Sequence, residues 1–375
     1  MAGIAAIVLL SGCSGSQSST LSFSGSAASQ SHSLADVARS GGSPKFIGFT
    51  RVPRPDRRGS QASGANLFVS DSSVNAVELL TNKKWKYVTD ITNGIDGPDG
   101  NWVANGEFYV ANYDGINITE YSSPTSLTYT YNSRMIDPVD VTVDRHGNVF
   151  EADYNYYGSL AGFVNEYKQG SNAVIATCSP GGGVEGVAVG KKGEVFADYN
   201  ATASGDGRIV RYLHGLPDCI RGKVLPISLS FAGGMALDNH GNLLVCDQNA
   251  ATVDVIPPPY TSIQKTFGSG FSIPFHITIN ARNTRAYVAD YGTGEVYVLS
   301  YPTGSLVATL GSSNGISFAW AAVDSNNYVP HRNPPRKREG LQNPTVVSVR
   351  HGLNAKTVPQ PESQRENVPP NSVVP

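Results

Sequence analysis

The sequence has few charged residues and almost no net charge. Only 15% of its 375 residues are Asp, Glu, Lys or Arg, and the formal net charge is −2. A protein that binds nucleic acid would carry a basic stripe interleaved with aromatic residues, and the body of the chain has none. We therefore expect no nucleic-acid partner.

Several catalytic motifs are also missing. The chain has no H-E-x-x-H zinc motif, no C-x-x-C pair and no G-x-x-x-x-G-K-[ST] phosphate loop. It also lacks the 3.6-residue hydrophobic periodicity of amphipathic helices. The 40 glycines and 18 tyrosines instead favour tight turns and strands. This composition is typical of an all-β protein and argues against a helical bundle.

The first residues have the pattern of an export signal. A short apolar run from Ile4 to Leu10 is followed by Leu10-Ser11-Gly12-Cys13, which resembles the bacterial lipobox. The run is too short to span a bilayer as a helix. We expect residues 1–12 to be a cleaved signal, Cys13 to be lipidated, and the protein to be anchored to a membrane of the cell envelope. The alternative is a plain signal peptide, which would make the protein secreted or periplasmic.

Both ends of the chain are poor in large apolar residues. Residues 13–63 are rich in Ser, Gly and Ala and then turn basic, and residues 329–375 combine many prolines with the charge run RKRE. Such segments cannot bury a core. We expect a flexible linker tethered at Cys13 and a disordered, basic tail, with one folded domain over residues 64–328.

The domain between these ends contains an internal repeat. Six apolar strands each end in a small residue and then an acid or amide, and successive endpoints are 41, 41, 45, 49 and 43 residues apart. These endpoints are Asp71, Asn112, Asp153, Asp198, Asp247 and Asp290. A period of 40 to 50 residues is typical of β-propellers with one four-stranded blade per repeat. Because six copies exceed the needs of a catalytic site, we expect these residues to be structural and to accept backbone N–H groups of the following turns.

The sequence also indicates how the ring closes. The last repeat segment, SFAWAAVD, matches a first strand without a second, and the segment GANLFVSD matches a second strand without a first. Joining the two completes one blade from both ends of the domain and leaves no open sheet edge in the ring. The sequence therefore predicts an all-β fold, a six-bladed β-propeller with four antiparallel strands per blade.

Three cysteines remain besides Cys13, which is an odd number. Cys246 stands in the apolar string NLLVCD, where a small buried thiol is expected. Cys178 and Cys219 would form a disulfide in an oxidising compartment if their Cα atoms were close, and the sequence leaves this open.

The strings PVDVTVDRHGNVFEAD and AGGMALDNHGNLLVCD resemble NHL repeats, which belong to the TolB-like propeller superfamily. The resemblance covers roughly residues 64–328. It implies the six-bladed fold but not a single function, because propellers of this kind include surface binding proteins, lyases, lactonases and scaffolds.

Aligning the six first strands gives candidate site residues. The alignment predicts one register, just ahead of each apolar run, for Asp99, Asp140, Glu185, Gly234, His276 and Trp320. The resemblance to NHL repeats implies that this register lies near one mouth of the central channel. Oxygen and imidazole ligands suit a divalent cation such as Ca²⁺ or Zn²⁺, with Asp99, Asp140, Glu185 and His276 as the metal ligands. Gluconolactonase-type propellers hold a metal in this way, and Asn101 would add an amide. The alternatives are structural: a hydrogen-bonded His276, a Trp320 packed in its blade, and an ordinary turn at Asp99.

Two classes of function remain from this sequence. The first is a non-enzymatic binding module, expected to be a monomer, that recognises a small molecule, glycan or protein at the mouth and loops, or that uses its outer faces as a scaffold. The alternative is a metal-dependent hydrolase or lyase of the lactonase kind, in which Asp140, Glu185 or His276 would act as ligand or base. No catalytic residue is assigned.

Overall fold

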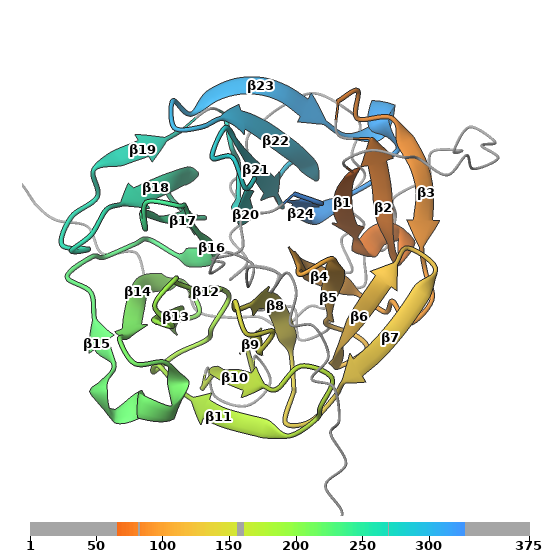
Figure 1. Cartoon of the computed structure of the whole chain (residues 1–375). Helices are drawn as coiled ribbons and strands as arrows, with labels where there is room; N and C mark the ends of the chain where they lie inside the picture. The colour runs from red at the N-terminus through yellow and green to blue at the C-terminus, as the bar shows by residue number, and fades with distance from the viewer. Residues whose placement is uncertain (1–65, 82, 156–160, 269, 327–375) are drawn as a thin grey trace, which may run out of the picture. The chain divides into compact units, whose positions relative to one another are not determined.

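The computed structural model describes residues 66–81, 83–155, 161–268 and 270–326. Their strands form six four-stranded antiparallel sheets around a common axis (Figure 1). The predicted all-β, six-bladed propeller is therefore confirmed. The described part of the chain contains no helix long and apolar enough to cross a membrane. The predicted signal, Cys13, the linker and the basic tail lie outside the described residues.

Each blade has its first strand at the axis and its fourth strand at the rim. The strands of blades 1, 2 and 3, from axis to rim, are β24 (Ala319–Asp324), β1 (Asn66–Asp71), β2 (Ala76–Thr81) and β3 (Tyr87–Ile91); β4 (Pro98–Ala104), β5 (Glu107–Asn112), β6 (Asn117–Ser123) and β7 (Ser126–Tyr131); β8 (Pro138–Val143), β9 (Val149–Asp153), β10 (Phe163–Tyr167) and β11 (Val174–Cys178). Those of blades 4, 5 and 6 are β12 (Val187–Val189), β13 (Val195–Thr202), β14 (Gly205–Tyr212) and β15 (Lys223–Val224); β16 (Ala232–Leu237), β17 (Leu243–Asp247), β18 (Thr252–Ile256) and β19 (Lys265–Phe267); β20 (Pro274–Ile279), β21 (Arg285–Asp290), β22 (Glu295–Ser300) and β23 (Ser305–Leu310). Within the described ranges, three short 3₁₀ helices lie in loops: η1 (Ser72–Val74), η2 (Leu216–Arg221) and η3 (Ser312–Asn314).

The ring closes as the sequence predicts. β24 pairs antiparallel with β1, so one blade takes strands from both ends of the domain. Asp71, at the end of β1, fastens the approach to β24, because its Oδ2 accepts the backbone N–H groups of Ser317 and Phe318 at 2.6 and 3.0 Å. Every residue of β24 is buried.

Local sequence explains the hairpins between first and second strands. Asn105 and Gly106 both have positive φ, 55° and 89°, as a tight hairpin turn between β4 and β5 requires. Gly147 and Gly241 occupy the same left-handed region in the turns RHGN and NHGN. A short polar turn therefore connects the first and second strands of blades 2, 3 and 5.

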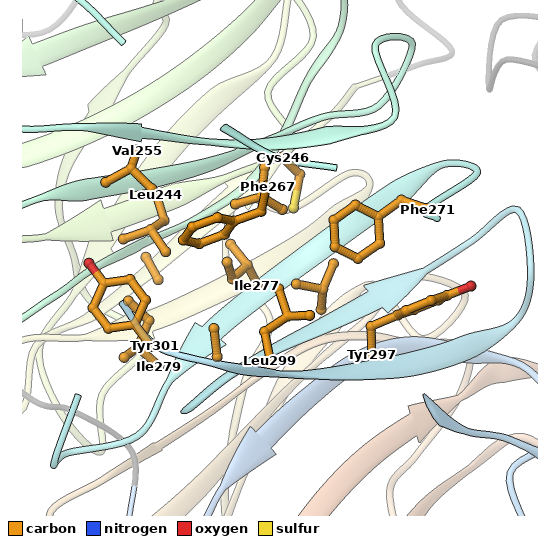
Figure 2. Packing of buried hydrophobic residues seen from close by; sticks show 14 residues of the cluster. Leu244, Cys246, Val255, Phe267, Phe271, Ile277, Ile279, Tyr297, Leu299 and Tyr301 are labelled. Carbon is orange, nitrogen blue, oxygen red and sulfur yellow. The ribbon is translucent and has the colours of Figure 1, made fainter. Parts of the chain in front are cut away.

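The core lies between neighbouring blades rather than inside each sheet. Figure 2 shows one such layer, in which Leu244 and Val255 of blade 5 face Ile277 and Leu299 of blade 6. Cys246 belongs to this layer as a buried free thiol, as predicted. Burial of these apolar faces holds adjacent blades together.

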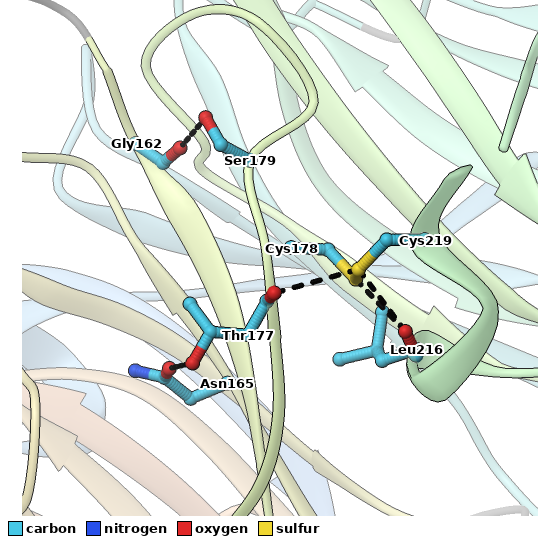
Figure 3. Close-up of a disulfide and its surroundings, with 7 residues drawn as sticks. All are labelled: Gly162, Asn165, Thr177, Cys178, Ser179, Leu216 and Cys219. Atoms are coloured by element: carbon cyan, nitrogen blue, oxygen red, sulfur yellow. Dashed lines mark hydrogen bonds between the residues drawn. A yellow bond between two sulfur atoms is a disulfide. The ribbon is translucent and has the colours of Figure 1, made fainter.

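Cys178 and Cys219 form a disulfide, which the sequence left open. Their Cα atoms are 5.7 Å apart, within the range that a disulfide spans. Cys178 ends β11 in blade 3, and Cys219 lies in η2 after β14 of blade 4 (Figure 3). The bond therefore links two neighbouring blades at the rim.

Candidate functional site

All six first strands begin on the same face of the ring, which we call the mouth face. Near its start, each first strand has one more residue than the second strand opposite it. In blade 3, for example, Pro138 pairs with Asp153 and Asp140 with the adjacent Ala152, which leaves Val139 as the extra residue of a β-bulge. A β-bulge changes the direction in which the side chains next to the extra residue point. The pairing is irregular at the equivalent place in the other five blades.

The bulges split the predicted single register into two rings. The axial ring is Gly100, Asp140, Gly186, Gly234, His276 and Ala321. The mouth ring consists of the residue before each of these: Asp99, Val139, Glu185, Gly233, Phe275 and Trp320. The prediction that Asp99, Glu185 and Trp320 share a register with Asp140 and His276 is corrected by one residue. The alignment did not account for differences between the blades in hairpin length and in the place of the repeat acid on the second strand.

Asp140 and His276 meet across the axis. Their strands, β8 and β20, belong to blades 3 and 6, which lie opposite one another in the ring (Figure 1). His276 Nε2 lies 3.0 Å from Asp140 Oδ1, and both side chains are 2% exposed. The carboxylate also accepts the backbone N–H groups of Val141 (2.8 Å) and Val187 (3.0 Å). Because a carboxylate only accepts, His276 donates from Nε2.

Small residues elsewhere in the axial ring make room for this pair. A Cβ atom added to Gly100 would lie 2.8 Å from Asp140 Oδ1, and one added to Gly234 would lie 2.9 Å from the Cα of His276. Larger side chains at these places would displace the pair. The axial ring is therefore a buried structural crosslink between opposite blades.

The mouth has a polar side formed by Asp99 and Glu185 of the mouth ring and by Gln248, which follows β17. Gln248 directly follows the repeat acid Asp247, and its Nε2 donates to Glu185 Oε2. All three side chains are buried, with exposed fractions of 2 to 4%. Neither Asp99 Oδ1 nor Gln248 Oε1 has a hydrogen-bond partner among the described residues. Two buried acceptors therefore lack a donor on this side of the mouth.

The polar side is also crowded with negative charge. Burial raises the pKa of the Asp99 carboxyl well above its usual range, and the nearby Asp140 and Asp114 raise it further. The pKa of Glu185 is likewise raised, first by burial and then by Asp198 and Asp99, against a lowering by the Gln248 hydrogen bond. In the described part of the chain, neither carboxyl forms an ion pair with Lys or Arg.

The other side of the mouth ring is aromatic. We call Phe275, Tyr291, Phe318 and Trp320 the aromatic arc. Trp320 contacts Phe275 edge-on at a centroid distance of 5.0 Å and Tyr291 at 4.9 Å. These residues come from blades 6 and 1, and the strand of Trp320 packs against that of Asp99. The mouth ring thus has two adjacent aromatic residues, Phe275 and Trp320, with Asp99 next to Trp320 in the following blade.

The six repeat acids and amides fasten the loops around the mouth. Asp153 shows the arrangement: Oδ1 accepts the N–H of Asn155 in the following turn, and Oδ2 accepts those of Ile136 and Asp137 before the first strand. Asp71, Asp247 and Asp290 accept comparable pairs of backbone N–H groups. Asp198 accepts the N–H groups of Glu185 and Gly186, and Asn112 accepts that of Asp96. The acids therefore position the mouth ring.

Sequence reasoning missed the residues that follow these acids. In four repeats the acid or amide is followed by tyrosine, as in Asn112-Tyr113 and Asp290-Tyr291, and in one by Gln248. Tyr291 belongs to the aromatic arc, and Tyr113 packs in the core cluster that contains Val139. The recurring Asp-Tyr pair was the signal that would have found them. Phe275 was missed because the alignment placed His276 at the mouth.

The predicted metal ligands do not all lie in one ring. Within the described ranges, no three His, Cys, Asp or Glu side chains come close enough together to hold a metal ion. Asp140 is already bonded to His276 and two backbone N–H groups, and it lies in a different ring from Asp99 and Glu185. The predicted ligands are therefore divided between the axial ring and the mouth ring. Asn101 lies inside the blade contact, where its Nδ2 donates to Ser70 Oγ at 2.9 Å.

One string has the spacing of a serine nucleophile motif. Gly311-Ser312-Ser313-Asn314-Gly315 matches G-x-S-x-G, but it forms the turn η3 before strand β24. The motif works in a strand–turn–helix setting, which is absent at this place. Ser313 Oγ contacts only the Asn314 amide oxygen, at 3.2 Å, among the described residues. We assign no chemistry to it.

The fold and mouth define a six-bladed β-propeller with a mixed acidic and aromatic mouth. No protein-family model and no curated protein matches the chain. Among solved structures, it is similar to a chain of the nidogen/laminin complex, with a TM-score of 0.56, 12% identity, and coverage of 70% of this chain and 98% of that one. A protein of unknown function from Bacteroides caccae gives a TM-score of 0.53, 12% identity, and 70% and 99% coverage. A functionally unknown protein from Desulfotomaculum acetoxidans gives 0.52, 13%, and 72% and 100%. These similarities establish the fold.

Proposed function

We propose that this chain is an exported, lipid-anchored, NHL-like propeller that binds a small polar ligand at its mouth face. The observation that carries the proposal is the pair of buried acceptors, Asp99 Oδ1 and Gln248 Oε1, that lack donors among the described residues. A buried acceptor without a donor is unfavourable, by about 1 to 3 kcal/mol. A ligand that donates hydrogen bonds would satisfy both, while the aromatic arc would contact its apolar part.

Two further observations support an exported binding module. The Cys178–Cys219 disulfide is of a kind that persists in oxidising compartments and is rare in the cytosol. One similar structure, of the nidogen/laminin complex, is a propeller in a complex between two proteins.

Ligand screening tests the site. We expect at least one compound from a panel of amines, monosaccharides and dicarboxylates to raise the melting temperature of the full chain. Phe275→Leu should weaken that compound's binding, because Phe275 is part of the aromatic arc, whereas His240→Ala on the opposite face should leave it unchanged. Isothermal titration calorimetry gives the affinities. A panel without any binder, or binding that Phe275→Leu does not affect, would refute a ligand site at the mouth.

Fatty-acid labelling tests the anchor. In a bacterial host, the wild-type chain should incorporate labelled palmitate and fractionate with membranes, because its Leu10-Ser11-Gly12-Cys13 string would direct lipidation of Cys13. Cys13→Ala should remove the label, while Cys246→Ala, which changes only a buried thiol, should retain it. An unlabelled wild-type protein would exclude lipid anchoring.

A further inference from the structure

The polar side of the mouth consists of acceptors rather than donors. Asp99 and Glu185 bring carboxyl oxygens, and Gln248 uses its amide N–H on Glu185, so that its Oε1 remains without a donor among the described residues. Asp99 and Glu185 are close enough for their charges to interact. A ligand placed between them must therefore supply several N–H or O–H groups.

The negative charge at the mouth restricts the class of ligand further. Asp99 and Glu185 lie near the carboxylate of Asp140, and His276 is the one basic side chain that the described ion pairs place at the axis. Two buried carboxyl groups in the same ring without a cation are unfavourable when ionised. A ligand that is both a donor and a cation satisfies the acceptors and the charge together. A neutral polyol would satisfy the acceptors alone.

The aromatic arc indicates the chemistry of the part of the ligand that does not carry the donors. Trp320 lies in the blade next to Asp99, with Phe275 and Tyr291 packed around it. Aromatic faces attract a cation and also bury carbon chains. A quaternary ammonium would suit the rings but would leave Asp99 Oδ1 and Gln248 Oε1 without donors, because it has no N–H group.

From this arrangement we propose that the mouth binds a primary ammonium ion carried on an apolar carbon chain. The ammonium N–H groups would bond to Asp99, Glu185 and Gln248, and the chain would lie against Phe275 and Trp320. This inference rests on the proposed function and names the ligand class of the same site.

Calorimetry with small isosteric probes tests the inference on the full chain. We expect n-butylammonium to bind. The neutral isostere n-butanol and the cation tetramethylammonium, which lacks N–H groups, should each bind with an affinity lower by a factor of about ten or more. Asp99→Asn and Glu185→Gln should each weaken n-butylammonium binding about tenfold or more. Asp206→Asn is the matched control, because Asp206 is an exposed carboxylate that pairs with Arg208 near the start of β14.

The outcomes separate this inference from the proposed function. Equal affinity for n-butanol and n-butylammonium, or unchanged affinity in Asp99→Asn, overturns the ammonium inference. A third outcome is that n-butylammonium fails to bind while methyl glucoside or Ca²⁺ binds, and that this binding is lost in Phe275→Leu or Glu185→Gln. That outcome overturns the ammonium inference but keeps a ligand site at the mouth. Melting curves of each variant show whether a loss of binding reflects a loss of folding, and in that case the tetramethylammonium comparison on the wild-type chain decides.

Discussion

Deleting residues 317–324 should abolish the soluble, cooperatively folded propeller. This segment contains β24, the innermost strand of blade 1, and its loss would expose the hydrogen-bonding edge of β1. It would also uncover Leu67 and Val69, which pack with Ala319 and Ala322. We expect aggregation on size-exclusion chromatography and no sharp unfolding transition.

A truncation after Arg332 provides the control for this deletion. The compact unit that contains the propeller ends at Arg332, so removal of residues 333–375 should leave its unfolding transition in place. A monomeric product without residues 317–324 that melts cooperatively would contradict the closure of the ring by β24.

A point substitution tests the same ring closure without removing a strand. Asp71→Ala removes the acceptor for the backbone N–H groups of Ser317, Phe318 and Ser73, and we expect it to lower the free energy of unfolding by about 3 to 5 kcal/mol. Asp71→Asn should lose less, because Asn112 accepts a backbone N–H at the equivalent place in blade 2.

The sequence carried enough information to predict the blades and their closure. Apolar strands, Gly-containing turns and acids recur at steps of 41 to 49 residues, and each of these signals is local. Six copies reinforce one another, so that the isolated strand Ala319–Asp324 could be assigned to the blade of Asn66–Asp71. Because each repeat has the same strands in the same order, a strand missing from one end of the domain could be matched to the unpaired strand at the other end.

The candidate site was harder to predict, because it depends on a single residue in each strand. Glu185 and Asp140 both stand 13 residues before the acid of their repeat, but the strand pairing places Glu185 in the mouth ring and Asp140 in the axial ring. The acid of blade 4 lies one step earlier on its second strand than the acid of blade 3 does. A shift of one residue changes which way a strand side chain points. The contact between Asp140 and His276, 136 residues apart, depends on the size of the ring and has no counterpart in local sequence. The Cys178–Cys219 pairing likewise required the positions of two blades.

His276→Ala should be among the most destabilising single substitutions in the protein. It removes the donor to the buried Asp140 carboxylate and leaves a cavity at the axis where opposite blades meet. Breaking a buried pair from one side typically costs about 3 to 5 kcal/mol. Because Val141 and Val187 still donate to Asp140, we expect a value near the lower end, about 3 kcal/mol, and a melting temperature lower by roughly 5 to 10 °C.

A double-mutant cycle separates the contact from the cavities. Asp140→Ala alone should destabilise by a similar amount, because the Val141 and Val187 N–H groups and His276 Nε2 all lose their acceptor. If the axial pair couples the opposite blades, the double variant should lose less than the two single losses together, with a coupling of about 1 to 3 kcal/mol. His240→Ala is the matched control, because the His240 side chain is 75% exposed and its ion-pair contact with Asp238 is long at 3.6 Å. This substitution should change the free energy of unfolding by no more than about 0.5 kcal/mol. Strictly additive losses at Asp140 and His276, measured by denaturant unfolding, would mean that the two side chains fill space at the axis without joining the blades.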